Sequence, residues 1–124
     1  MTSNWFLRFG VFFALCGMGL GIHMAATHDH VLAPLHAHVN LLGWVTMFLA
    51  GLFYFVRPEC DGRMAKVHLT LAVVGLLILG PGLYGVLTGL PWGEPAAAAG
   101  SMITLASMLV FAYVVFTAPA RQKA

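Results

Sequence analysis

Four long apolar stretches constrain the fold of this chain more than any other feature of its sequence. They cover approximately residues 5–27, 34–57, 67–88 and 96–118 of the 124. Each stretch is long enough to cross the hydrocarbon core of a bilayer, which takes about 20 residues of α-helix. Lipid cannot satisfy the backbone polar groups of loops or open sheet edges, so the stretches must be helical. The sequence therefore predicts an all-α transmembrane four-helix bundle, with residues 1–124 forming a single integral membrane domain.

The first stretch also has some features of a signal peptide. Arg8 precedes most of its apolar run, and the small residues of "MAAT" stand near its end. The run is longer than the apolar region of a signal peptide, which spans about 7–15 residues. We therefore interpret the first stretch as a retained membrane span.

The basic residues predict the orientation of the chain. If the N-terminus is cytoplasmic, all six Lys and Arg residues lie at the inner ends of the spans or in the inner loop, and the outer loops hold only Asp29 and Glu94. The positive-inside rule favours this arrangement. We expect a multi-pass protein of a bacterial inner (cytoplasmic) membrane with both termini cytoplasmic, and the net charge of +2 then reflects topology and not a nucleic-acid-binding patch. The six residues are Arg8, Arg57, Arg63, Lys66, Arg121 and Lys123.

Small residues recur four positions apart in three of the spans. This spacing lets helix backbones approach closely in lipid. The simplest interpretation is packing within one chain, although packing between subunits is also open. The repeats are Gly17 with Gly21, Gly85 with Gly89, and Ala96 with Gly100 and Thr104.

Histidines are the chain's most unusual polar residues. The segment "HDHVLAPLHAH", residues 28–38, holds four of the six. Imidazole is the commonest side-chain metal ligand, and ionisable groups within membrane spans are by default functional candidates. His23, His36 and His38 are expected at one depth near the outer ends of the first two spans, and we expect the last two, beside Asn40, to bind a metal or a haem.

The spacing of His36 and His38 sets a geometric condition. Two helical residues turn about 200°, so the two imidazoles point to nearly opposite sides of their helix. They are badly placed to chelate one ion and well placed to serve two neighbouring sites. His28 and His30 are expected to be loop residues, with Asp29 as a partner.

His68 is expected to belong to a different part of the molecule. It begins the third span at the inner side, at about the depth of Phe55 on the second span. Phe55 follows His38 by 17 residues, which is about 25 Å along a helix. Two ligands on opposite sides of one iron lie only about 4 Å apart. We therefore expect His68 to be interfacial or hydrogen-bonded to a neighbour, and not to share an iron with the outer histidines.

One span resembles a known family. The stretch "HVNLLGWVTMFLAGLFYFVRPE", residues 38–59, is similar to the second transmembrane helix of subunit I in the haem–copper oxidase and nitric oxide reductase superfamily, most of all in the nitric oxide reductases and cbb3-type oxidases. There a His-x-Asn-Leu-Leu helix ending in an aromatic-rich turn with Pro-Glu supplies an axial histidine to the low-spin haem b. The resemblance implies that role for His38, with "NLL" at 40–42 and "PE" at 58–59 matching. The "HAH" pair also resembles the tenth helix of that family, where two histidines face two different haems.

The departures from that family are equally informative. The family subunit has about twelve helices, arranged as three similar four-helix arcs, whereas this chain has four spans. The further histidines of the family's copper or non-haem iron centre have no counterpart here, so we do not expect this chain alone to reduce oxygen or nitric oxide. A four-helix chain resembles one arc, and three copies could rebuild the ring. We therefore expect a homotrimer with haem b at the subunit interfaces, where His38 serves one haem and His36 the next, with a dimer or His23 as the second ligand as the fallback.

The leading hypothesis is a b-type haem protein of the membrane that works in electron transfer, haem handling or gas sensing. Two alternatives remain open. The first is a copper-binding membrane protein, because imidazole and thioether ligands suit copper. Its outer-face ligands would be His28 and His30 of "HDH" with His36 and His38 of "HAH", helped by Met24 and Met18. The second is a non-catalytic assembly partner of an oxidase, in which the histidines are merely polar.

Overall fold

The computed structural model describes residues 1–120, and within that range the regular structure is entirely helical. Four helical segments are long and apolar enough to cross a membrane, so the chain is a multi-pass membrane protein. The first, third and fourth are α1 (Thr2–Thr27), α4 (Arg63–Leu87) and α5 (Gly93–Thr117). The second has three consecutive parts, which are α2 (Ala33–His38), the π-helix η1 (Val39–Thr46) and α3 (Met47–Val56).

The helix ends differ from the expected ones by a few residues. α4 begins at Arg63 and not near residue 67, because Arg, Met, Ala and Lys are all good helix formers and the preceding Gly62 is the first residue outside the helix. α5 begins at Gly93 and includes Pro95, which the first turn of a helix tolerates. The inner loop is correspondingly short and contains one 3₁₀ turn, η2 (Pro58–Cys60).

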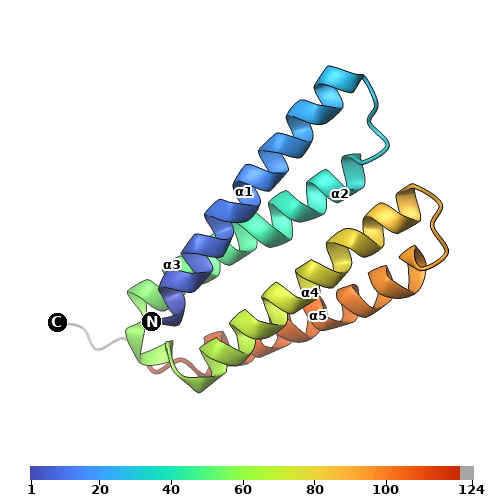
Figure 1. Ribbon diagram of the computed structural model, residues 1–124. Coiled ribbons are helices and arrows are strands. Elements are labelled where there is room, and N and C mark those ends of the chain that lie inside the picture. The colour runs from blue at the N-terminus through green and yellow to red at the C-terminus, as the bar shows by residue number, and fades with distance from the viewer. Residues whose placement is uncertain (121–124) are drawn as a thin grey trace.

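The spans form two antiparallel hairpins (Figure 1). One pairs α1 with α2, η1 and α3, and the other pairs α4 with α5. Glycines allow the close approach in both hairpins. A Cβ added at Gly17 would lie 2.5 Å from the Asn40 side chain, and one at Gly82 would lie 2.4 Å from the backbone nitrogen of Ala97. The interpretation of the small residues as packing within one chain is therefore confirmed for Gly17. Gly82 belongs to none of the expected repeats, and Gly89 has nothing within 4 Å of the position of an added Cβ.

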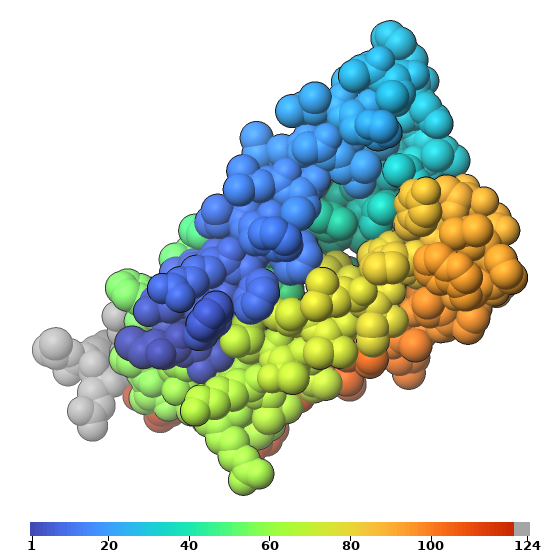
Figure 2. Space-filling model, in the orientation of Figure 1, coloured from blue at the N-terminus to red at the C-terminus, as the bar shows by residue number. Residues whose placement is uncertain are grey.

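The two hairpins share a core in the half of the bundle that holds the N-terminus and η2. Phe6, Tyr54 and His68 are completely or almost completely buried there, and the ring of Phe111 stacks on His68. Toward the opposite end the ribbons of α1 and α4 diverge (Figure 1). The space-filling view shows the first hairpin, in blue and cyan, and the second, in yellow and orange, as two bodies that meet along a seam (Figure 2).

The N-terminus of α1 is capped from the inner loop. The carboxylate of Asp61 accepts hydrogen bonds from the backbone amides of Thr2 and Ser3, each 3.1 Å long. Burial alone raises the pKa of Asp61, but the hydrogen bonds from Thr2 and Ser3 outweigh it and hold the pKa below its usual value. A negative charge at a helix N-terminus also interacts favourably with the helix dipole. This contact fixes α1 to the loop that joins the two hairpins.

Candidate functional site

The π-helix of the second span begins directly after His38. A π-helix is rare, and π segments occur frequently at functional sites. Side chains provide hydrogen-bond partners for carbonyls around this transition. The Nδ1 of His38 bonds the carbonyl oxygen of Pro34 at 2.7 Å, and the amide of Asn40 donates to the carbonyl oxygen of His36 at 2.8 Å. Such bonds matter in lipid, where no water satisfies a free carbonyl.

The hydrogen bond of His38 fixes its tautomer. Because a carbonyl oxygen can only accept, Nδ1 carries a proton, and in the neutral imidazole Nε2 then has a free lone pair. Metal-bound histidines almost always donate their other ring N–H to a carbonyl, a carboxylate or water in this way. The residue is partly exposed, so it can be approached from outside the bundle.

His36 has different surroundings, as the two-residue spacing predicts. Its Nδ1 donates to the carbonyl oxygen of Gly17 on α1 at 2.9 Å. A Cβ at Gly21 would lie 3.0 Å from the Cε1 atom of His36, so the ring also packs against that glycine. The Asn40 amide nitrogen lies 3.5 Å from Nε2 of the same ring. His36 is thus held within the first hairpin, whereas the ring of His38 bonds only its own helix.

The remaining outer candidates are dispersed. His23 is exposed on α1, and His28 ends α1 in a left-handed conformation with φ 55°. Asp29 accepts a hydrogen bond from the backbone amide of Val31 at 3.0 Å, so its carboxylate stabilises the turn instead of pairing with the flanking histidines as expected. His30 is exposed in the same loop.

The copper ligands expected from sequence do not form an evident cluster. Met24 is only 6% exposed, whereas His28 and His30 lie on the exposed loop. Within residues 1–120, no group of three or more His, Cys, Asp and Glu side chains is arranged to hold a metal ion.

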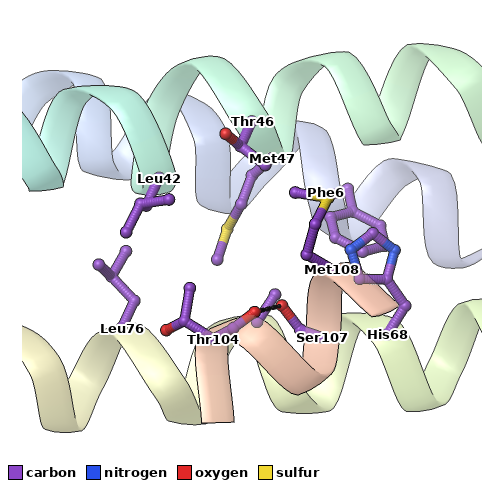
Figure 3. A pocket seen from close by; sticks show the side chains of 10 residues that line it. Phe6, Leu42, Thr46, Met47, His68, Leu76, Thr104, Ser107 and Met108 are labelled. Carbon is purple, nitrogen blue, oxygen red and sulfur yellow. Dashed lines mark hydrogen bonds between the residues drawn. The ribbon is translucent and has the colours of Figure 1, made fainter. Parts of the chain in front are cut away.

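An enclosed cavity of about 20 Å³ lies between the two hairpins (Figure 3). A cavity of this size has room for about one water molecule. It is far too small for a porphyrin. Its polar atoms include the hydroxyl of Ser107, which donates to the carbonyl oxygen of Thr104 at 2.7 Å. The lining residues are Phe6, Leu42, Thr46, Met47, His68, Ala72, Leu76, Thr104, Ser107 and Met108.

His68 forms a separate buried pair with Tyr54. The Tyr54 hydroxyl lies 3.0 Å from Nδ1 of His68, and the imidazole ring is 4.7 Å from the centre of Phe6 and 4.8 Å from that of Phe111. The expectation that His68 is hydrogen-bonded to a neighbour and remote from the outer histidines is confirmed. The sequence did not identify Tyr54 as the partner. The expected depth of His68, opposite about Phe55, does lie next to Tyr54 in the sequence.

Comparisons with known proteins give one partial similarity. The chain is 31% identical over 68 residues to cytochrome c oxidase subunit 1 of Rhodobacter capsulatus. The similarity covers 48% of this chain but only 13% of that protein. No protein-family model matches the chain, and no solved structure matches it. The chain therefore resembles part of an oxidase subunit and spans a small fraction of its length.

Proposed function

We propose that this chain is a b-type haem-binding membrane protein in which Nε2 of His38 ligates the iron. The observation that carries the proposal is the 2.7 Å hydrogen bond from Nδ1 of His38 to Pro34, which in the neutral imidazole leaves Nε2 free to bind a metal on a partly exposed ring. The resemblance of residues 38–59 to a haem-ligating helix supports the same residue, and the partial similarity to an oxidase subunit supports a haem or copper cofactor in general.

The haem would lie outside the four-helix bundle. The enclosed cavity of about 20 Å³ has no room for it, and the ring of His38 makes no hydrogen bond to another helix among the described residues. A haem on the outer surface of one bundle would expose its other face to lipid or to a second subunit. We therefore propose a homo-oligomer, with a trimer favoured over a dimer, in which haem b occupies the subunit interfaces.

The second iron ligand would come from His36 or His23. The Nδ1 of His36 also donates to a carbonyl, that of Gly17, so its Nε2 is likewise free of a proton. Its ring would have to turn away from α1 to reach a cofactor outside the hairpin, whereas His23 is already exposed on α1. Asn40 would act as a positioning residue for His36 through the bond to its carbonyl.

Haem held by two histidines would supply one-electron transfer and would have no open position for oxygen or nitric oxide, whereas haem held by one histidine would leave a position open for such a gas. The residues of this chain would hold the imidazole in one orientation, cover the porphyrin edge with apolar side chains and keep water away. We propose electron transfer or haem and gas handling in a bacterial inner membrane as the role, with the basic end of the bundle cytoplasmic. Catalysis by the chain alone is not part of the proposal.

Absorption spectroscopy of the purified, dithionite-reduced protein tests the proposal. A sharp Soret band with an α-band is expected, together with haem b by extraction and with no stoichiometric copper. Native mass spectrometry from mild detergent should give haem-bearing trimers. Copper without haem would contradict the haem assignment, and haem carried only by monomers would contradict the interface location.

A further inference from the structure

We propose that the exposed face at the start of α4 binds the headgroup and the upper acyl chain of an anionic phospholipid. A surface groove of about 280 Å³ runs along this face, and Arg63 and Lys66 stand at its beginning. The two cations are three residues apart, so their side chains are neighbours on the helix surface. Both residues are exposed. The remaining lining residues are Val67, Thr70 and Leu71.

The two cations of this groove have no ion-pair partner among residues 1–120, although Glu59 lines a neighbouring pocket together with Arg63. The ion pair in that part joins Arg57 to Glu59 in the inner loop. The nearby carboxylate of Asp61 is engaged by the amides at the start of α1. Within residues 1–120, neither Arg63 nor Lys66 forms an ion pair. Two adjacent cations are thus available to an anion from outside.

The position of these cations within α4 is electrostatically unfavourable for the helix itself. The N-terminus of a helix carries a partial positive charge and prefers acidic side chains. The first turn of α4 has no acidic residue and contains Arg63, with Lys66 next to it. A bound phosphate would interact favourably with both cations and with the helix terminus. The positive-inside pattern explains cations at this end of the bundle, but not why two of them share one exposed face above a groove.

The rest of the groove is suited to an acyl chain. Val67 is 38% exposed, and Leu71 follows it four residues deeper along the same face. The hydroxyl of Thr70 donates to the carbonyl oxygen of Lys66 at 2.9 Å, so its proton needs no partner from a ligand. Cations at the end of a span with aliphatic side chains one to two turns further in match a phospholipid better than a free phosphate ion.

Native mass spectrometry of the full chain in detergent, titrated with phosphatidylglycerol or with phosphatidylcholine of the same chain length, tests the proposal. We expect phosphatidylglycerol to bind more tightly, and Arg63→Gln and Lys66→Gln each to weaken it about fivefold. The charge-preserving Lys66→Arg should retain binding. Arg8→Gln is the matched control, because Arg8 lies at the same end of the bundle, 5.1 Å over the Trp5 ring on α1, outside this groove. It should change binding less than twofold.

Three results would overturn the proposal. Equal binding of the two lipids would show that the headgroup charge is not recognised. An equal loss in Arg8→Gln and Arg63→Gln would show a general effect of charge. Complete displacement of phosphatidylglycerol by millimolar inorganic phosphate would show a free-anion site. Circular dichroism of each variant establishes that the helices are intact, and the Lys66→Arg result applies even if a glutamine variant fails to fold.

Discussion

The hydroxyl of Tyr54 lies 3.0 Å from Nδ1 of His68, and both side chains are buried between the two hairpins. Tyr54 belongs to the second span and His68 to the third, so this single hydrogen bond joins the hairpins inside an aromatic cluster. The rings of Phe6 and Phe111 pack against His68, so the two polar groups depend on each other as partners. The pair therefore contributes to holding the bundle together at this end.

Removing one member of this pair should destabilise the bundle. We predict that Tyr54→Phe lowers the free energy of unfolding by about 1–3 kcal/mol, because it leaves the buried Nδ1 of His68 without a partner. The measurement is thermal or denaturant unfolding in detergent micelles.

A second variant isolates the hydrogen bond from packing. In Tyr54→Phe/His68→Phe both polar groups are replaced by apolar rings, which can be nearly neutral. The double variant should therefore be more stable than the sum of the two single losses predicts. Strict additivity would contradict the account of this pair.

Close packing of α4 and α5 depends on Gly82. A Cβ there would lie 2.4 Å from a backbone atom of Ala97, which cannot move without shifting α5. We predict that Gly82→Ala lowers the free energy of unfolding by about 1–3 kcal/mol. Gly80, two residues earlier in the same helix, has nothing within 4 Å of the corresponding position. Gly80→Ala should be neutral or stabilising by up to about 1 kcal/mol, and comparable losses in both variants would count against the packing argument.

The Asp61 cap predicts a pH-dependent stability. The pKa of Asp61 is lower in the folded protein than its ordinary value of 3.8. Its contribution is therefore present above the ordinary pKa and is lost as the pH falls through the lower, folded value. We predict that Asp61→Asn lowers the free energy of unfolding by about 1 kcal/mol at pH 7, because an amide has one acceptor oxygen for the two backbone amides and no charge.

The quantity to measure is the difference in the free energy of unfolding between Asp61→Asn and the unchanged protein. This difference should shrink as the pH falls below 3.8, because Asp61 then becomes protonated. The other carboxyl groups titrate equally in both proteins, so their contributions cancel. Unfolding of both proteins in detergent between pH 7 and strongly acidic pH measures it. A loss of the same size at every pH would show that the charge of the cap is unimportant.

The spans were predictable because hydropathy and length decide them. Lipid allows a chain this apolar few alternatives, and the four expected stretches coincide with the four observed ones to within a few residues. The separation of His68 from the outer histidines was also predictable, because helical rise converts sequence distance directly into depth. The close contact of Gly17 followed from small-residue spacing, whereas that of Gly82 belongs to none of the expected repeats.

Three features were not predictable from the sequence. The residues of the π-helix at Val39–Thr46 are mostly apolar, as they would be in a membrane-spanning α-helix, and none of them indicates a π-helix. Asp61 lies 59 positions from Thr2 and 58 positions from Ser3 in the sequence, so no local pattern reveals that it caps α1. The inward position of His36 depends on the gap that Gly17 and Gly21 leave in α1, so it required the packing of the hairpin to be known.

The dithionite-reduced absorption spectrum of purified His38→Ala tests the central claim most directly. The account predicts that this substitution abolishes the Soret and α-bands, whereas His68→Ala, at the buried inner pair, and His30→Ala, on the exposed outer loop, leave them nearly unchanged. Oligomeric state and helicity should be measured on the same samples, so that loss of haem is distinguished from loss of fold. A His38→Ala protein that retains the full haem spectrum would contradict the assignment of this imidazole as the iron ligand.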